Sequence, residues 1–396
     1  MHLVQKIVLF TFKFPYGQQE TFLETEVKYL SSRFDRVVIL PLFGEKNLRE
    51  VPKNVEVLSP VFEKRSKKIA LTLLRLNALN FILRFWTFDI AGMKKLFKQA
   101  IVVGGLSNYL LKHKELQEDS VWYFYWGTNS VNILNTIQHP KSIARFHRFD
   151  LYGEEVPGGE VQVGHRYLSK KLAKLVFISR EGLEYFSAKF PDNRQRYELS
   201  YLGTVDYGLG KQREESSDVF RIVTCSNIIP VKRVHLVAEA LSLIEDKKIE
   251  WVHFGSGDEG SVSLVKKAVK SFSENITFVE MGRRTNKEIL SFYKENSVDL
   301  FINVSVSEGL PVSIMEAISF GIPVIATDCG GVREVVDSSN GALLPVEITP
   351  KELAICISDL LDDSLGRKRE RSREVWEEKF SASKNYERFC DIIESI

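Results

Sequence analysis

The sequence is poor in cysteine and lacks the spacings that would give cysteine a structural role. Four cysteines occur in 396 residues, with no C-x-x-C pair and no histidine cluster nearby. Neither a disulfide framework nor a regularly spaced zinc site is therefore indicated. Isolated thiols of this kind are typical of a reducing compartment, and we expect a cytoplasmic protein without a metal centre.

Long apolar runs and a strong net charge are missing as well. The most hydrophobic candidate, residues 69–92, is interrupted by Arg75, Arg84 and Asp89, which makes it a poor membrane span. A strand pattern begins close to the first residue, so we expect no secretory signal. The formal net charge of +2 indicates no particular partner, and no nucleic-acid-binding motif is present, so we expect no nucleic-acid partner.

Strand and helix patterns alternate along the chain, which predicts an α/β protein with parallel sheets. A length of 396 residues suits two or three domains. Residues 6–41 predict a strand, a helix and a strand, and residues 220–254 repeat this pattern. The polar, glycine-bearing residues 207–218 form the best linker between them. We therefore expect two Rossmann-like domains, residues 1–206 and residues 219–374.

The most informative stretch, residues 299–336, predicts a strand, a turn, a helix and a second strand. Glu308 falls in the turn, just past the carboxyl end of the strand, where open α/β sheets bind ligands. Glu316 follows eight residues later in a helix that starts near Pro311. The turn and the helix start offer N–H groups to an anion; these belong to Gly309, Leu310, Val312 and Ser313.

Two carboxylates around an anion-binding turn suit a ligand that carries hydroxyl groups at both ends and phosphates between them. A nucleotide sugar is such a ligand. In this interpretation the sugar lies near Glu308, the diphosphate lies on the helix amides, and the ribose hydroxyls lie on Glu316.

The two glutamates, set in SEGLPVSIMEA and followed by GIPVIATDCGG, resemble the E-x7-E signature of the GT4 family of retaining glycosyltransferases, which have the GT-B fold. The resemblance implies two Rossmann-like domains that face each other across a cleft. It also implies that a C-terminal helix, about residues 375–396, packs back on the first domain. The expected activity is sugar transfer from a UDP- or GDP-linked donor with retention of configuration. No cofactor is implied, and no D-x-D stands at a strand end of the second domain to indicate a metal.

The opening phrase FPYGQQETF resembles a subset of this family that builds bacterial surface polysaccharides. That resemblance implies a role in the synthesis of lipopolysaccharide, capsule or exopolysaccharide, with a lipid-linked or oligosaccharide acceptor. Gly17 stands in this first loop in place of the family's multi-glycine loop, and a small residue there lets backbone approach the donor. Farther on, the pattern R-x-H-x-x-D resembles the family segment whose histidine contacts the transferred sugar, which makes His147 a catalytic candidate.

The loop at residues 226–233 resembles the family's G-R-L-x-x-x-K-G. Lys232 takes the lysine position, where it would neutralise the diphosphate as a point charge and assist catalysis. Asn227 replaces the family's arginine, and Arg233 replaces its glycine. A second cation is therefore expected from another residue, with Arg233 as one candidate and Arg283 or Arg284 as further candidates. Gly255, in a G-x-G loop, is another candidate for the donor site.

Residues 64–114 are helical in pattern and strongly basic. Eleven basic side chains stand against one carboxylate, 11 − 1 = +10, with large apolar side chains between them. Such a segment suits the anionic inner face of a plasma membrane, but a helical pair with solvated charges fits it equally. The basic residues are Lys64, Arg65, Lys67, Lys68, Arg75, Arg84, Lys94, Lys95, Lys98, Lys112 and Lys114.

Two other functions compete with sugar transfer. A sugar-nucleotide 2-epimerase shares the plan of two Rossmann-like domains, but it needs an acid/base pair around C2, which the sequence does not show in the right context. The other alternative is a catalytically inactive scaffold that keeps the fold. Asn227 favours this alternative weakly, whereas Glu308, Glu316, Lys232 and His147 oppose it.

Overall fold

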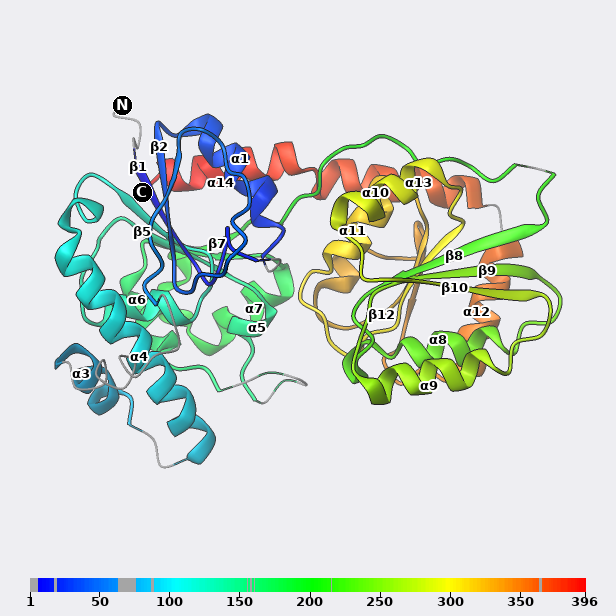
Figure 1. Ribbon diagram of the computed structural model, residues 1–396, viewed down its shortest axis with the longest axis horizontal. Coiled ribbons are helices and arrows are strands. Elements are labelled where there is room, and N and C mark those ends of the chain that lie inside the picture. Colours follow the sequence, from blue (N-terminus) through cyan, green and yellow to red (C-terminus); the bar gives the residue numbers. More distant parts are fainter. Residues whose placement is uncertain are drawn as a thin grey trace. The chain divides into compact units, whose positions relative to one another are not determined.

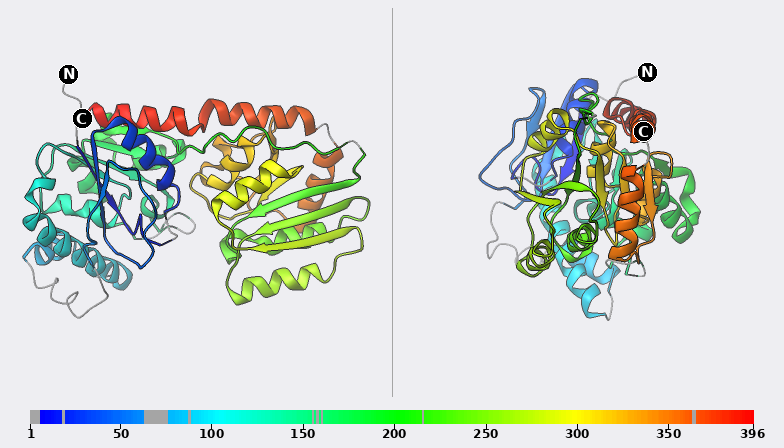
Figure 2. Two further views of the ribbon diagram at one scale, coloured as in Figure 1. Left: turned by 45° about the horizontal axis from the view of Figure 1, so that its top comes forward. Right: turned by 90° about the vertical axis from the view of Figure 1, so that its right-hand side faces the viewer.

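A computed structural model describes residues 6–17, 20–62, 76–86, 89–154, 156, 159, 161–214, 216–362 and 365–396. The chain divides into two compact units (Figures 1 and 2). Unit 1 contains residues 1–201 and 383–396, and unit 2 contains residues 202–382. Each unit is built on its own parallel sheet, so the predicted α/β class with two Rossmann-like domains is confirmed.

Unit 1 holds a sheet of seven strands in the order β3-β2-β1-β4-β5-β6-β7. Its strands are β1 (Lys6–Thr11), β2 (Arg36–Pro41), β3 (Val55–Val57), β4 (Val121–Phe124), β5 (Ser142–Phe146), β6 (Lys174–Phe177) and β7 (Tyr197–Leu199). Its helices are α1 (Leu23–Arg33), α3 (Leu76–Arg84), α4 (Ile90–Lys112), α5 (Arg148–Leu151), α6 (His165–Lys171), α7 (Arg180–Lys189) and α14 (Ala382–Glu394). Short 3₁₀ turns lie at Lys114–Leu116, Asn129–Asn135 and Pro191–Arg196.

Apolar side chains alternate between the two faces of the first sheet. In β1, Val8 and Phe10 join one core cluster, whereas Ile7 and Leu9 join another. Because successive side chains of a strand point to opposite faces, a strand that is apolar throughout must be covered on both sides. The strand order reverses between β1 and β4, and such a switch point leaves a crevice at the carboxyl ends of the strands.

Helix α14 completes the core of unit 1 from the far end of the sequence. Phe389 and Ile393 are fully buried in the core cluster that lies on one face of the first sheet. The guanidinium of the fully buried Arg145 lies 4.0 Å from the centre of the Phe389 ring. Arg33 of α1 binds Glu394, with 2.7 Å between Nε and Oε1. The last turns of the chain are therefore an integral layer of this unit (Figure 2).

Unit 2 holds a sheet of six strands in the order β10-β9-β8-β11-β12-β13. Its strands are β8 (Val219–Cys225), β9 (Lys248–Phe254), β10 (Ile276–Gly282), β11 (Leu300–Asn303), β12 (Val324–Thr327) and β13 (Gly341–Leu344). Its helices are α8 (Val234–Leu241), α9 (Glu259–Val269), α10 (Asn286–Glu295), α11 (Val312–Ser319), α12 (Pro350–Asp362) and α13 (Leu365–Lys379). Short 3₁₀ turns lie at Pro230–Lys232 and Gly330–Glu334. The strand order reverses between β8 and β11, so the switch point lies there.

Two predicted elements are shorter than the sequence indicates. The apolar pattern of residues 299–306 predicts a strand over all eight of them, but β11 ends at Asn303, because the Ser305 N–H turns to the Asn303 side chain at 3.1 Å. The pattern of residues 365–396 predicts one helix, but the structure divides it into α13 and α14. The backbone of Thr204 bonds to Phe380 and Ala382 at 2.9 and 3.0 Å, and this bridge takes the chain out of the helix.

The predicted basic segment is only partly visible in the fold. Helices α3 and α4 occupy most of its second part, and Lys64, Arg65, Lys67, Lys68 and Arg75 lie outside the described residues. Within the described part of the chain, no helix combines the length and the hydropathy that a membrane span requires.

Candidate functional site

Lys232 and Glu308 meet at the switch point of the second sheet. Lys232 ends the 3₁₀ turn that follows β8, and Glu308 lies in the loop that follows β11. Because β8 and β11 are parallel neighbours, their carboxyl ends bring the two loops together. The Lys232 ammonium lies 2.5 Å from Glu308 Oε1. The two strongest sequence candidates therefore form an ion pair at the place where this fold binds ligands.

Two further side chains hold the Glu308 carboxylate, and neither belongs to a motif that is visible in the sequence. Ser305 Oγ donates to Oε1 at 2.7 Å, and Asn303 Nδ2 donates to the same oxygen at 3.2 Å. Glu308 is only 8% exposed. Three donors on one oxygen of a buried carboxylate fix its direction, since each charge-assisted hydrogen bond restricts the side chain further.

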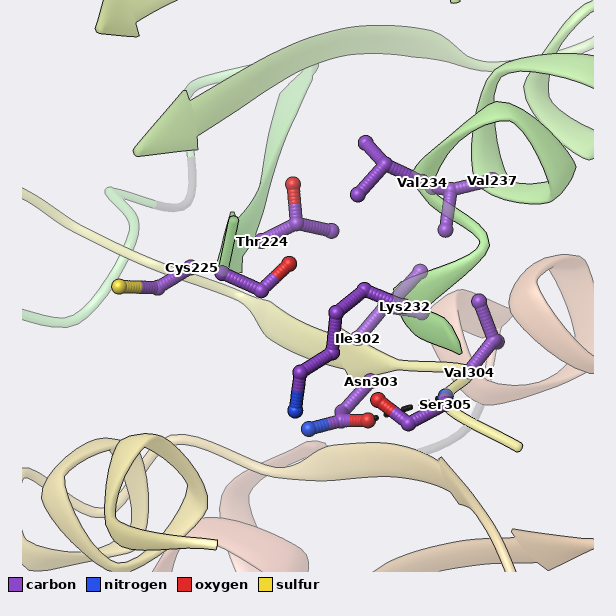
Figure 3. A pocket seen from close by; sticks show the side chains of 10 residues that line it. Thr224, Cys225, Lys232, Val234, Val237, Ile302, Asn303, Val304 and Ser305 are labelled. Atoms are coloured by element: carbon purple, nitrogen blue, oxygen red, sulfur yellow. Dashed lines mark hydrogen bonds between the residues drawn. The ribbon is translucent and has the colours of Figure 1, made fainter. Parts of the chain in front are cut away.

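A small depression adjoins this ion pair. Figure 3 shows the Lys232 side chain reaching across the depression toward the Asn303 amide, while the Cys225 sulfur points the other way. The lining combines the ends of β8 and β11 with the start of α8. Its residues are Thr224, Cys225, Ser226, Lys232, Val234, Val237, Ile302, Asn303, Val304 and Ser305.

Glu316 is buried in α11 and is held by a residue from another helix. Asn286, the first residue of α10, donates to Glu316 Oε1 at 2.6 Å. Burial raises the pKa of Glu316 to about 7, although the Asn286 hydrogen bond acts in the opposite direction. Burial also raises the pKa of Cys225 to about 12; Glu316 raises it further and Lys232 lowers it. Glu316 and Lys232 thus act in opposite directions on the pKa of the same thiol.

Helix α11 begins at Val312, so Pro311 lies one position before the helix and not at the first helical position that the sequence predicts. Within this turn the N–H of Ile314 donates to Pro311 O at 3.1 Å. The N–H groups of Val312 and Ser313 precede that bond, and helix starts leave such groups for an outside acceptor. Leu310 is buried, and Gly309 is partly buried.

The Gly-Gly turn after β12 is packed directly against the Glu308 loop. Gly330 has φ +59°, and a Cβ there would lie 2.0 Å from the carbonyl oxygen of Glu308. The Gly331 N–H donates to the Gly309 carbonyl at 2.7 Å. Only glycine allows this approach, so the GG motif shapes the backbone that carries Glu308.

Arg233 serves the loop framework in this structure. It adopts a left-handed conformation, φ +47°, at the position where the family pattern has glycine. Its Nε donates to the Val304 carbonyl at 2.7 Å, and its Nη1 donates to the Val346 carbonyl at 2.6 Å. These two hydrogen bonds hold the guanidinium against backbone carbonyl groups. Its role as a second cation for the donor stays a prediction.

The other expected donor-binding residues fall into two groups. Asn227 and Arg283 are exposed on loops after β8 and β10, and their roles stay predictions. Gly255 instead closes the framework: its N–H donates to Gly282 O at 2.9 Å, and a Cβ would lie 1.9 Å from Ser226 O. Glycine is thus required at position 255 because two loops pack together there. Its N–H is already bound to a backbone carbonyl of the protein.

His147 lies in unit 1, at the carboxyl end of β5. Its Nε2 lies 3.1 Å from the carbonyl oxygen of Tyr125. Because a carbonyl only accepts, Nε2 carries the proton. Burial lowers the pKa of His147 to about 3, and Arg145 lowers it further. His147 is therefore neutral at physiological pH, and its backbone N–H is held by Asp150 at 2.6 Å.

The first loop of unit 1 is organised by Glu20, a residue whose role no local sequence pattern indicates. Its buried carboxylate accepts the N–H groups of Phe12, Lys13 and Phe14 at 3.1, 2.7 and 2.7 Å. It also accepts Trp126 Nε1 at 2.6 Å, and the Trp126 ring lies 4.7 Å from the His147 ring. Three successive N–H groups around one carboxylate make an anion-binding nest, and here the chain fills that nest itself.

Gly17 is also bound within the first loop of unit 1. Its N–H donates to Asn47 O at 2.9 Å, and its φ is +65°. Glycine is needed for this turn because the left-handed conformation disfavours a side chain. The structure thus accounts for Gly17 within the loop, and contact with the donor stays a prediction.

Comparison with known proteins adds a family match for one unit. Residues 219–363 match the family model described as Glycosyl transferases group 1. The O-antigen biosynthesis glycosyltransferase WbnH of Escherichia coli is 32% identical over 145 residues, which span 36% of this chain and 38% of that protein. The chain therefore matches well under half of the length of this curated relative.

Solved structures resemble the whole chain. Anabaena Alr3699/HepE in complex with UDP and glucose superposes with a TM-score of 0.65 and 16% identity over all of both chains. WaaG, a glycosyltransferase involved in lipopolysaccharide biosynthesis, gives a TM-score of 0.65 and 15% identity over 98% of this chain and 99% of its own. The chain has the GT-B fold. At these identities the likeness establishes the architecture, and the chemistry rests on the residues.

Proposed function

We propose that the protein is a glycosyltransferase that moves a sugar from a nucleoside-diphosphate sugar to a lipid-linked or polysaccharide acceptor in bacterial surface-polysaccharide synthesis. The observation that carries this proposal is the Lys232–Glu308 ion pair at the β8/β11 switch point, followed along the chain by the buried Glu316 of α11. The match of unit 2 to the Glycosyl transferases group 1 model supports it. The O-antigen enzyme among the partial relatives favours this pathway class.

We assign the donor phosphates to Lys232, which lines the depression, and to the first N–H groups of α11. Lys232 would leave Glu308 in part and pair with the phosphate that becomes the leaving group. Val312 and Ser313 would donate their backbone N–H groups to the same oxygens. Preorganised donors aimed at developing charge usually make the largest contribution to catalysis.

Glu316 fits the ribose of the nucleotide. Its carboxylate is held by a side-chain hydrogen bond from Asn286, and carboxylates bind paired hydroxyl groups of ribose in nucleotide folds. We assign Glu308 to the donor sugar, because hydrogen bonds from Asn303 and Ser305 already fix the direction of its carboxylate.

The transfer itself is proposed to occur on one face of the sugar. The bond between the anomeric carbon and the phosphate oxygen breaks, and a bond from the acceptor oxygen to the same carbon forms. The acceptor proton passes to the leaving phosphate oxygen, so configuration is retained. A hydrolase-type route needs a carboxylate nucleophile at the anomeric carbon, and in the present proposal Glu308 orients the sugar and does not attack it.

We also propose that the reaction needs no metal, because Lys232 and the helix amides supply the positive charge. Initial rates in the presence of a chelator test this point. Unchanged rates support it, whereas loss of activity that Mg²⁺ or Mn²⁺ restores would assign the leaving-group charge to a metal.

Nucleotide release tests the proposed function directly. The full chain is incubated with UDP- and GDP-linked sugars, with and without a bacterial lipid extract. Release of nucleotide that depends on the extract supports transfer. An isomerised sugar nucleotide without nucleotide release would indicate an epimerase, and donor binding without turnover would indicate an inactive scaffold.

A further inference from the structure

The two oxygens of the Glu308 carboxylate are bound very differently. Oε1 accepts hydrogen bonds from Lys232 Nζ at 2.5 Å, from Ser305 Oγ at 2.7 Å and from Asn303 Nδ2 at 3.2 Å. Oε2 has no hydrogen-bond partner in the part of the chain that the structure describes. One oxygen therefore anchors the side chain, and the other is left for a group that the protein itself does not supply.

Asn303 and Ser305 are bound to each other as well as to Glu308. The Ser305 N–H donates to Asn303 Oδ1 at 3.1 Å, a bond drawn as a dashed line in Figure 3. The Asn303 amide therefore uses its oxygen for the backbone and its nitrogen for the carboxylate. Rotation of this buried amide would break both bonds, so the orientation of its N–H donor is fixed.

The backbone of Ser305 is also held from the neighbouring strand. Thr327, the last residue of β12, donates its hydroxyl to the Ser305 carbonyl, and Cys329 Sγ donates to the same oxygen at 3.3 Å. Ser305 is 1% exposed. Because its N–H, its carbonyl and its hydroxyl are all bonded within the protein, Ser305 presents a rigid donor to Glu308.

Lys232 is the mobile member of the three donors. Its side chain is 23% exposed, and a lysine carries its charge on a flexible four-carbon stem. In the proposed reaction Lys232 moves in part from Glu308 to the leaving phosphate. The two buried donors would keep their bonds to Oε1 during this exchange, because the proposed phosphate site does not use them.

We infer that Asn303 and Ser305 are positioning residues for sugar transfer: they hold Glu308 Oε1 so that Oε2 faces a hydroxyl of the donor sugar while Lys232 moves to the phosphate. This inference rests on the proposed function and adds to it a division of tasks between the two carboxylate oxygens. A group that is already in place when charge develops costs no reorganisation during the reaction. Loss of a positioning donor should therefore lower kcat and leave nucleotide binding nearly unchanged.

Two other roles for the same side chains predict different results. Asn303 and Ser305 line the depression, and direct contact with the donor would make their loss weaken nucleotide binding. A purely structural role would lower the melting temperature and leave the kcat of the folded variant normal. The geometry favours positioning, because Ser305 Oγ and Asn303 Nδ2 both donate to Glu308 Oε1.

Ser305→Ala tests the inference with the smallest change of shape. We expect kcat for nucleotide release to fall about tenfold, with the donor KM and the affinity for UDP or GDP changed less than about twofold. Ser372→Ala is the matched control, because Ser372 is fully buried in the same unit and its hydroxyl donates to the Asn340 carbonyl at 3.2 Å. The control should keep the wild-type kcat. An unchanged kcat in Ser305→Ala, or an equal fall of kcat and nucleotide affinity, would overturn the positioning role.

A double-mutant cycle shows whether Ser305 acts through Glu308. Glu308→Ala removes the carboxylate that Ser305 holds, so adding Ser305→Ala to it should change kcat less than about twofold. A tenfold loss in both backgrounds would overturn the inference. Asn303→Ala should lower kcat at least as much as Ser305→Ala, because it also removes the acceptor of the Ser305 N–H.

The wild-type reaction distinguishes failure of this inference from failure of the proposed function. Sugar transfer by the wild type together with a normal kcat in Ser305→Ala would overturn the positioning role alone. Absence of transfer from every UDP- and GDP-linked sugar would overturn the proposed function, and the positioning role with it. Thermal unfolding of each variant, followed by circular dichroism, verifies that the rates are those of folded protein.

Discussion

The Lys232 ammonium and the Glu308 carboxylate form a 2.5 Å ion pair between two loops that are 76 residues apart in sequence. Parallel pairing of β8 with β11 produces this contact. In the proposed reaction the donor opens the pair, because Lys232 exchanges part of its bond to Glu308 for a phosphate. Removal of either side chain should therefore have a distinct effect on binding and on turnover.

Lys232→Met should weaken the binding of a nucleoside diphosphate about tenfold or more, because a charge-assisted contact to phosphate is lost. Isothermal titration with UDP and GDP measures the change. Lys248→Met is the matched control, since Lys248 pairs with Asp218 on the surface of the same unit. Equal affinities in wild type and Lys232→Met would place the phosphates elsewhere.

Glu308→Gln should leave nucleoside diphosphate binding largely intact and lower turnover on the order of 10² or more. The amide keeps the shape but removes the charge that faces the sugar. Initial-rate measurements on the accepted donor give the ratio. A normal rate would remove Glu308 from the mechanism, and isolation of a glycosyl–Glu308 adduct would replace same-face transfer by a covalent route.

Glu316 links the stability of unit 2 to pH. Its pKa is raised from 4.5 to about 7 by burial, so the folded chain holds this proton more tightly than the unfolded chain. This contribution to stability is full below about pH 4.5 and is lost as the pH rises through about 7. Glu316→Gln has no such carboxyl group to lose a proton. When the pH is raised from 5 to 8, its free energy of unfolding should therefore increase relative to that of the wild type, by on the order of 3 kcal/mol.

Urea unfolding of the wild type and Glu316→Gln at the two pH values measures this difference. Glu295→Gln, on the surface of α10, serves as the control for loss of a carboxylate. An equal pH response of wild type and Glu316→Gln would show that Glu316 is ionised as easily in the folded chain as in the unfolded one.

Arg233 should matter for the folded loop more than for phosphate binding. Arg233→Ala removes the donors to Val304 and Val346 and should cost about 2 kcal/mol. Arg233→Gly loses the same bonds but adopts the left-handed conformation without strain, so it should be about 1 kcal/mol more stable than Arg233→Ala. Chemical unfolding measures both values. Unchanged stability with a large loss of nucleotide affinity would restore Arg233 as the second cation.

Glu20→Ala should destabilise unit 1 by about 3 kcal/mol or more, because four N–H donors lose their acceptor. Glu24→Ala is the matched control. Glu24 is half exposed and pairs with Arg49, a surface contact worth less than about 1 kcal/mol. Thermal unfolding compares the two. Similar losses would show that the nest around Glu20 is not a strong constraint.

The sequence indicated the positions of Lys232, Glu308 and Glu316 because each is tied to a local strand–loop–helix pattern. It did not indicate Asn286, which reaches Glu316 from 30 residues away through a strand order that no local pattern encodes. Asn303 and Ser305 were adjacent to the predicted site, but their direction depends on where β11 ends. The early end of that strand comes from a side-chain bond to Ser305 N–H.

The break in the C-terminal helix also depends on a contact that is distant in the sequence. Residues 365–396 have an uninterrupted helical pattern, and the break near Ser381 comes from Thr204, 177 residues away in sequence. Arg233 shows the reverse case: its position matches a glycine in the family pattern, and the left-handed backbone at Arg233 gives the physical reason for that glycine.

The central claim is that Lys232 and Glu316 of unit 2 hold one sugar nucleotide. Isothermal titration of the accepted sugar nucleotide into wild type, Lys232→Met and Glu316→Ala tests this claim most directly. The account predicts one donor per chain for the wild type, with affinity at least tenfold weaker in each variant. Equal affinity in all three proteins, or no binding of any UDP- or GDP-linked sugar to the wild type, would contradict it.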